Sequence, residues 1–259
     1  MPTGRCRFLE WAALAILALR TVTAEPQPVR HTRGFIHGFI VLKDTEDKIL
    51  VSGEVIQTQA GARINGVIVL HFNDGSQYRE TTLFSQRRVF HLIKYKLIKK
   101  GPSFKRDETL AVDVATGNVS VEYTDKGGKD KTISEYLVLP PDLANGMSPT
   151  LMADLDPRVE TTQSMVVSTP KPRVVQLKIA ASGEESYTIA GIAGRATHYV
   201  IKIDIGGITG VAAKVVGKQP APVDFWVTKD APTFLRSEGP LCYTKTGQSG
   251  ASSLRAPSG

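Results

Sequence analysis

Residue types that carry catalysis are present in this chain, but not in the arrangements that catalysis needs. Ser148 stands in Gly-Met-Ser-Pro, which lacks the second glycine of a hydrolase nucleophile elbow. Residues 127–132 read Gly-Gly-Lys-Asp-Lys-Thr, but the glycines and lysines are misplaced for a phosphate loop. This segment also lies between two expected strands, as a hairpin loop does. The sequence therefore predicts no catalytic residue and no enzyme.

Metal-binding and acid–base patterns are equally weak. No histidine lies within four residues of another, so no local metal-binding pair exists. The histidines are His31, His37, His71, His91 and His198. Asp154 and Asp156 flank Leu155 just before Pro157, where a helix would end, and Glu184 adjoins Glu185 in an expected turn. We expect structural roles for these groups, and neither a metal nor another cofactor.

A basic cluster is the first feature that suggests binding. Its members fall on one expected strand, residues 89–99, and on its flanks. The candidates for contact with a membrane surface are Arg87, Arg88, Lys94, Lys96, Lys99 and Lys100. Such a patch attracts anionic lipid head groups. Alternatively, these side chains are solvated and protect a strand edge from mispairing. Interleaved exposed aromatic residues are missing, so nucleic acid is not an expected partner.

A small apolar segment is the second such feature. Residues 206–216 begin with two glycines and lead to a Pro-bounded exit before Phe225 and Trp226. This is the composition of a mobile cover over an apolar cavity. A packed crossover between two strands fits the same residues.

Both features lie on or beside segments in which hydrophobic and polar residues alternate, as they do in strands. About a dozen segments with a period of two, separated by turns such as residues 73–76, predict an antiparallel sheet, barrel or sandwich. Residues 143–155 have apolar residues at helical spacing, interrupted by Pro149. They predict one broken helix or two short helices against the sheet.

The N-terminus has the layout of a secretory signal peptide, with a basic start, a short apolar run and small residues ending at Ala24. Residues 1–24 are expected to be removed, residues 25–33 to form a flexible leader, residues 34–243 a single β-rich domain, and residues 244–259 a disordered tail. Cleavage removes three arginines and one glutamate, which lowers the net charge from +7 to +5. It also leaves Cys242 without a partner for a disulfide within the chain. We expect a soluble exported protein, periplasmic or secreted.

Several short motifs resemble a group of uncharacterised exported bacterial proteins. They are Ala-Thr-His-Tyr-Val, Gly-Gly-Ile-Thr-Gly, Val-Val-Gly-Lys-Gln-Pro, Phe-Trp-Val and Ser-Glu-Gly-Pro-Leu within residues 196–241, with residues 84–88 and 139–146. The ending is also loosely similar to domain-of-unknown-function family 3108. This resemblance implies a mainly β fold, a large curved antiparallel sheet that forms a half barrel or open barrel with one or two short covering helices, like the periplasmic lipoprotein carriers. It implies no catalytic residue.

Two functional hypotheses follow. In the first, the protein binds or carries an apolar, lipid-like ligand inside the sheet. The candidates for the lining are Ile64, Ile68, Leu70, Ile93, Tyr95, Leu97, Ile201 and Ile203. In the second, it is a structural or interaction protein of the cell envelope that binds another protein through its sheet face or edge. An unfilled cavity favours the first hypothesis, and a filled core with an exposed apolar patch favours the second.

Overall fold

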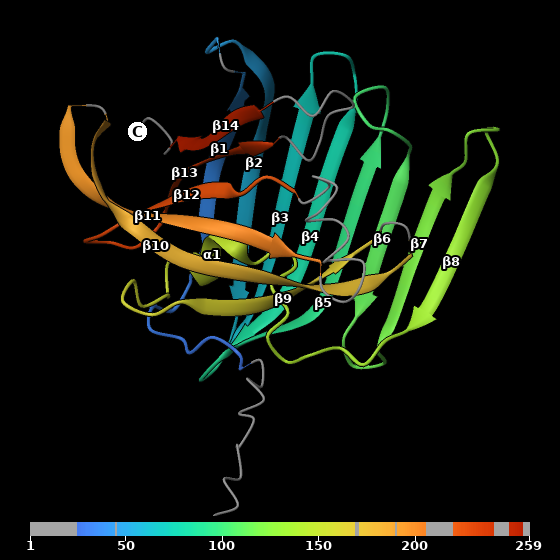
Figure 1. Cartoon of the computed structure of the whole chain (residues 1–259), viewed down its shortest axis with the longest axis horizontal. Coiled ribbons are helices and arrows are strands. Elements are labelled where there is room, and N and C mark those ends of the chain that lie inside the picture. The colour runs from blue at the N-terminus through green and yellow to red at the C-terminus, as the bar shows by residue number, and fades with distance from the viewer. Residues whose placement is uncertain are drawn as a thin grey trace, which may run out of the picture.

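A computed structural model describes residues 25–44, 46–168, 171–189, 191–205, 220–240 and 249–255, with the backbone alone for residues 240 and 249–255. Nearly all the regular structure is antiparallel β (Figure 1). The strands are β1 (Ile36–Lys43), β2 (Ile49–Ala60), β3 (Arg63–Phe72), β4 (Gln77–Gln86), β5 (Phe90–Lys100), β6 (Glu108–Asp113), β7 (Asn118–Thr124), β8 (Asp130–Tyr136), β9 (Thr161–Val167), β10 (Arg173–Ile189), β11 (Ile192–Asp204), β12 (Val223–Thr228), β13 (Phe234–Pro240) and β14 (Ser249–Arg255).

The strands form one continuous sheet in the order β8-β7-β6-β5-β4-β3-β2-β1-β14-β13-β12-β11-β10-β9. Two runs of sequential strands, β1–β8 and β9–β14, are joined where β1 pairs with β14. The sheet is not closed, because β8 and β9 remain at its two ends. The predicted fold class, a large curved antiparallel sheet with a short helix, is confirmed.

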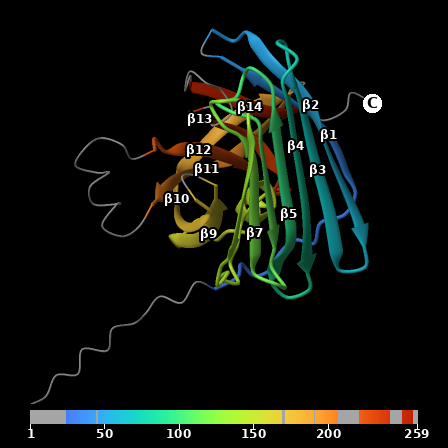
Figure 2. The same cartoon turned by 90° about the vertical axis from the view of Figure 1, so that its right-hand side faces the viewer.

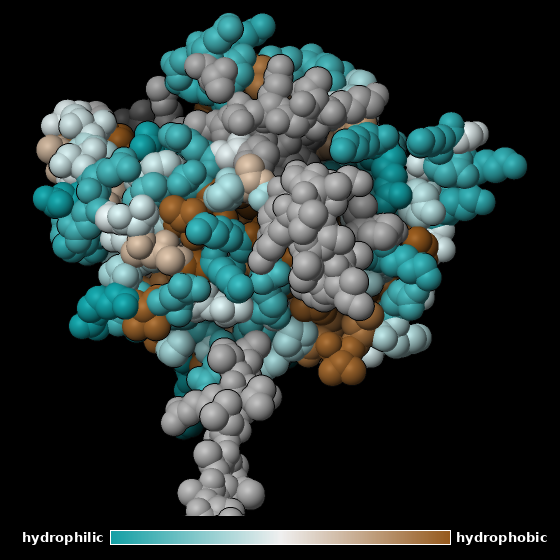
Figure 3. Space-filling model, viewed as in Figure 1, coloured by the Kyte–Doolittle hydropathy of each residue, from teal (hydrophilic) through white to brown (hydrophobic). Residues whose placement is uncertain are grey.

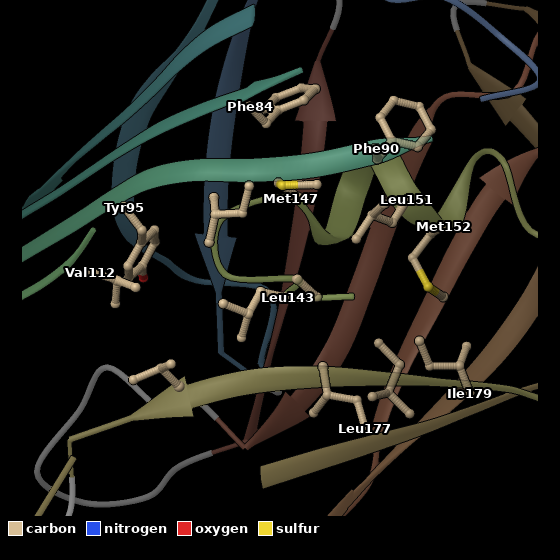
Figure 4. Close-up of a cluster of buried hydrophobic side chains, with 14 of the residues drawn as sticks. Phe84, Phe90, Tyr95, Val112, Leu143, Met147, Leu151, Met152, Leu177 and Ile179 are labelled. Atoms are coloured by element: carbon tan, nitrogen blue, oxygen red, sulfur yellow. The ribbon is translucent and has the colours of Figure 1, made fainter. Parts of the chain in front are cut away.

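The two arms of the sheet face each other across the core. Figure 2 shows strands β1–β5 on one side and β9–β12 on the other. The largest hydrophobic cluster draws its side chains from both arms and from residues 143–155. In Figure 4, Met147, Leu151 and Met152 lie between Phe84 and Phe90 of one arm and Leu177 and Ile179 of the other. We call residues 140–155 the inner segment. It lies between the arms and packs against both.

The inner segment contains less helix than its spacing predicts. The only helical residues within it are those of α1 (Ser148–Met152), with Pro149 in the first turn, where a proline needs no partner for its missing N–H. Gly146 precedes the helix with a φ of +67°, which breaks any helix that would begin earlier. A Cβ atom there would collide with the side chain of Thr82 on β4. Glycine therefore lets the inner segment lie directly on the sheet.

The inner segment also covers the outer edge of β9. The N–H of Ala144 donates to the carbonyl of Ser164 over 2.8 Å, and the N–H of Ser164 donates to the carbonyl of Asp142 over 3.3 Å. The side chain of Asn145 then imitates a strand: its Nδ2 donates to the carbonyl of Val166 over 2.9 Å, and its Oδ1 accepts from the same residue's N–H over 2.8 Å. The edge is thus paired without another strand.

Residues 25–33 are fixed in place, which differs from the expected flexible leader. The fully buried carboxylate of Asp154 accepts from the backbone N–H groups of Arg30 and His31, and pairs with the Arg33 guanidinium at 2.5 Å. The N–H of Phe90 donates to the carbonyl of Gln27 over 2.9 Å. Proline and polar composition suggested a loose segment, but these partners lie far along the chain and local composition does not reveal them.

The expected disordered tail contains a strand. Residues 249–255 form β14, which pairs with β1 on one side and β13 on the other. Ser/Gly-rich composition argues only weakly against a strand here, because the backbone N–H and C=O groups of β1 and β13 need hydrogen-bond partners. The expected signal peptide (1–24), the expected cover (206–216) and Cys242 lie outside the described residues. Among those described, no helix is long and apolar enough to cross a membrane.

Candidate functional site

A β-bulge in β5 separates residues that simple alternation places together. Phe84 of β4 pairs with Leu92, and Leu83 pairs with Lys94, so Ile93 is an extra residue without a partner. Phe90 and Leu92 before the bulge face the core, as Tyr95 and Leu97 do after it. A strict period of two predicts one shared face for His91, Ile93, Tyr95 and Leu97. That prediction is wrong, because a bulge shifts the alternation by one residue.

The bulge directs Ile93 toward a pocket on the outer face of the sheet. Register places Arg63, Ser85 and His91 side by side on β3, β4 and β5, on the face opposite the buried Ile64 and Phe84. The β2–β3 turn and Arg87 complete the walls. We call this site, of about 570 Å³, the outer pocket; it is lined by Ala60, Gly61, Ala62, Arg63, Ser85, Arg87, His91 and Ile93.

The outer pocket combines positive charge with apolar surface. Arg63 and Arg87 are exposed, and no ion pair joins either to another described residue. Ser85 and His91 add a hydroxyl and an imidazole to the same wall. Guanidinium groups present several N–H donors that match phosphate and carboxylate oxygens. Ile93, Ala60 and Ala62 offer hydrocarbon instead, so the pocket suits an anion attached to an apolar group.

The other seven lining candidates lie in the core. Ile64, Tyr95 and Ile201 belong to the main cluster, and Leu70 to a second cluster beside it. The half-buried candidates packed against these clusters are Ile68, Leu97 and Ile203. The inner segment covers part of this face, since Gly146 lies against Thr82 and Tyr95. Of the eight candidates, only Ile93 lines the outer pocket.

The basic candidates also separate. Arg87, Arg88, Lys94, Lys96 and Lys100 are exposed, and Lys94 pairs with Asp113 at 3.1 Å. Lys99 instead lies next to Tyr78 and Glu108 in the strand register, and its Nζ is 3.0 Å from the buried Glu108 carboxylate. Because Lys99 already has this partner on the inner face, it is unsuited to a membrane surface.

Glu108 is the centre of an inner polar cluster. Arg106 contacts its carboxylate at 2.7 Å, and the Ser168 hydroxyl donates to it over 2.8 Å. Burial disfavours its ionised form, but Lys99 and the hydrogen bonds from Arg106 and Ser168 together hold its pKa below the usual value. The fixed partners make this cluster structural.

A second inner carboxyl, Glu80, was not singled out from sequence. The Tyr78 hydroxyl donates to its Oε2 over 2.8 Å. Burial raises the pKa of Glu80, and hydrogen bonds from Tyr78 and Tyr95 oppose the rise. The alternation of residues along β4 could have placed Glu80 on the inner face, because Tyr78, Glu80 and Thr82 share the face of Phe84.

The remaining sequence candidates have structural surroundings. His198 stacks on Trp226 with ring centroids 4.4 Å apart and bonds the Asp224 carboxylate at 2.7 Å. Arg236 covers the same indole ring at 4.0 Å, and Trp226 is buried in a small cluster separate from the main core. Within the described part of the chain, no group of three or more His, Cys, Asp or Glu side chains could hold a metal ion.

Comparison with known proteins identifies similar folds without an assigned activity. No family model matches the chain, and no curated protein matches it. Among solved structures, it is similar to the β-barrel-like protein of domain of unknown function DUF1849 from Brucella abortus, with 10% identity, a TM-score of 0.47, and coverage of 87% of this chain and 98% of that one. It is also similar to the hypothetical lipoprotein YmcC from Escherichia coli, with 7% identity, a TM-score of 0.35, and coverage of 86% and 85%.

Proposed function

We propose that the protein is an exported, non-catalytic binding protein of the bacterial cell envelope, whose outer pocket holds the anionic head of a lipid-like molecule. The observation that carries the proposal is the outer pocket itself, in which Arg63 and Arg87 stand beside Ile93. The signal-like layout of residues 1–24 supports export to the periplasm or beyond.

The chemistry of the pocket favours an amphiphile over either a purely apolar or a purely anionic ligand. Exposed guanidinium groups would be left beside hydrocarbon if a wholly apolar molecule entered. A small anion such as phosphate would contact the arginines but leave the space next to Ile93 and Ala62 unused. A phosphate or carboxylate head with the start of an acyl chain satisfies both kinds of wall.

The exposed lysines and arginines near the pocket support the same ligand class. Arg88 follows Arg87 directly, and Lys94 and Lys96 continue along the outer side of β5. Positive charge there would draw the protein toward an anionic membrane surface. Peripheral contact of this kind would bring the outer pocket to its ligand.

The test is calorimetric titration with short-chain phosphatidylglycerol below its micellar concentration, beside phosphatidylcholine of the same chain length and inorganic phosphate. We expect phosphatidylglycerol to bind most tightly. Replacing both pocket arginines (Arg63→Gln with Arg87→Gln) should weaken binding at least about tenfold, from the loss of charge-assisted hydrogen bonds. Arg79→Gln is the matched control, because Arg79 is an exposed arginine on the outer side of β4, away from the pocket.

A second variant tests the apolar wall. Ile93→Trp should fill the pocket and abolish lipid binding while the melting temperature stays near that of the native protein. Unchanged binding by the double arginine variant, or by Ile93→Trp, would show that the ligand does not occupy this site.

A second function, binding of another envelope protein through the sheet, is favoured by a different part of the molecule, the end of the sheet formed by β8. There the outer side of β8 pairs with no described strand. Tyr136 and Val138 beside it are 80% and 98% exposed.

A further inference from the structure

The outer edge of β8 stands at one end of the sheet, at the rim of the molecule (Figure 1). Among the described residues, no strand pairs with it and no segment covers it as the inner segment covers β9. The rim on this side is mostly hydrophilic (Figure 3). A partner here would therefore be recognised by backbone groups and charge.

The hydrogen-bond phase of the β7–β8 hairpin shows which backbone groups of β8 are free. The N–H of Asp125 donates to the carbonyl of Lys129 over 2.8 Å, and the N–H of Leu137 donates to the carbonyl of Gly117 over 2.9 Å. Antiparallel ladders alternate between bonded and non-bonded pairs, so odd-numbered residues from 129 to 137 bond toward β7. The outward N–H and C=O groups are those of Asp130, Thr132, Ser134 and Tyr136.

The side chains of β8 are complementary to a second copy of the same strand. Lys131 and Glu135 lie two residues on either side of Ile133. In an antiparallel pair centred on Ile133, Lys131 of each copy is opposite Glu135 of the other. The same register places Thr132 opposite Ser134 and Asp130 opposite Tyr136, so all four outward-facing residues form hydrogen-bonded pairs. Lys131 and Glu135 then occupy non-bonded pairs, where opposing side chains lie closest.

We propose that two copies of this protein associate through β8, antiparallel and in the register centred on Ile133, so that the two sheets become continuous across a twofold axis. Lys131 is exposed, and its carboxylate neighbour, Asp125, is 4.0 Å away. Tyr136 and Val138 flank the edge and gain cover from the second copy. Such a pair is closed, because each copy uses the same surface.

Charged residues on an edge strand also serve to prevent pairing. On β8 that purpose would be met by any arrangement of charges, whereas the observed one is symmetric about Ile133. Shifting the register by two residues keeps the backbone hydrogen bonds but removes the contact between Lys131 and Glu135. One direction places Glu135 opposite Ile133, and the other places it opposite Lys129 in the turn before β8. The register centred on Ile133 is the one in which both partners of the charged pair lie within β8.

Charge reversal tests the pairing directly. Sedimentation velocity of the mature chain over a range of concentrations should show a monomer–dimer equilibrium. Lys131→Glu should raise the dissociation constant about tenfold or more, because two like-charge contacts replace two attractive ones. Glu135→Lys should do the same. The variant that carries both changes should recover dimerisation, since the pairs are restored with reversed sign.

A backbone variant tests the edge itself. Thr132→Pro removes an outward N–H and leaves the bonds to β7 intact, so the dimer should be lost while the monomer stays folded. Thr132→Val keeps the N–H and should still dimerise. A monomer at every concentration would overturn the proposal. So would a dimer that survives both Lys131→Glu and Thr132→Pro, because its copies would meet elsewhere.

Discussion

The outer edges of β8 and β9, at the two ends of the sheet, both carry backbone N–H and C=O groups that pair with no described strand, but their surroundings differ. At β9, the inner segment supplies a carbonyl, an N–H and the Asn145 side chain to the edge, and the residues that do so are buried. At β8, the strand is largely exposed and carries Asp130, Lys131 and Glu135. Within the described part of the chain, the β9 edge has hydrogen-bond partners, and the β8 edge is left to water or to another molecule.

This difference indicates where stability and association reside. Buried backbone groups without partners are costly, so the β9 edge depends on an inner segment that fits closely. Exposed groups are satisfied by water, so β8 tolerates change with little loss of stability. Changes at β9 should therefore alter folding, and changes at β8 should alter association alone.

The largest contrast should come from two glycines with similar backbone conformations. Gly146 on the β9 side and Gly128 in the β7–β8 turn have φ values of +67° and +74°. Gly146→Ala should lower the free energy of unfolding by about 3 kcal/mol or more, because the new methyl collides with Thr82 in addition to the unfavourable φ. Gly128→Ala meets open space and should cost only about 1 kcal/mol. Urea denaturation measures the free energy of unfolding of both variants. Equal losses would mean that the collision with Thr82 adds no cost at Gly146.

Asparagine side chains give the next contrast. Asn145→Ala leaves a buried N–H and a buried carbonyl of Val166 without partners, which should cost about 2–3 kcal/mol. Asn118 on β7 accepts one exposed hydrogen bond from Ser134, and Asn118→Ala should cost less than about 1 kcal/mol. Thermal denaturation of the two variants side by side checks the difference. A larger loss for Asn118→Ala would reverse our assignment of the stabilising edge.

Two aspartates should respond oppositely to pH. Burial raises the pKa of Asp142 above its ordinary 3.8, and hydrogen bonding with Ser164 offsets this only in part. Its contribution to stability is complete below the unfolded pKa and is lost as pH rises through the folded pKa. Asp142→Asn should therefore stabilise the protein by about 1 kcal/mol at pH 7 and by nothing near pH 3.

Asp125 behaves in the reverse sense. Backbone hydrogen bonds from Lys129 and Gly127 lower its pKa, with a contribution from Lys131. Its contribution is complete above the unfolded pKa and is lost as pH falls through the folded pKa. Asp125→Asn should thus destabilise slightly at pH 7 and not at pH 2. Melting temperatures measured across this range decide the matter: parallel pH profiles for the two variants would contradict both assignments.

The smallest effect belongs to the free edge. Thr132→Pro should change the free energy of unfolding of the monomer by less than about 0.5 kcal/mol, since the lost N–H faces outward. Val166→Pro removes an N–H that Asn145 uses and should be clearly destabilising. A large loss of unfolding free energy from Thr132→Pro, measured at a concentration where the protein is monomeric, would mean that another segment of the same chain already pairs with the β8 edge.

Local patterns in the sequence predict most of the strands but not how they are assembled. Turn chemistry marks hairpins such as Phe72–Gln77, where Gly75 donates to the carbonyl of Phe72 and the Asp74 carboxylate accepts from Ser76. Alternation then identifies the flanking strands. It fails at Ile93, because the bulge lacks a glycine or proline to announce it. A single extra residue there redistributes β5 between core and surface.

The outer pocket and the inner segment escape prediction for a different reason. Arg63, Ser85 and His91 become neighbours only through the register of three strands, which local periodicity does not specify. Residues 143–155 were expected to cover the sheet, and they lie between its arms because the second arm folds over them. Both features depend on contacts between residues distant in the chain.

The pairing of β1 with β14 has a consequence for biogenesis. Ile40 of β1 lies opposite Leu254, so β1 gains its second neighbour only after β2–β13 have been synthesised. Contacts of such large sequence separation form late and slow folding. A nascent chain cannot complete this sheet until residues 249–255 have left the ribosome. If the chain is exported as we propose, this delay favours its passage through a translocation channel before the sheet is complete.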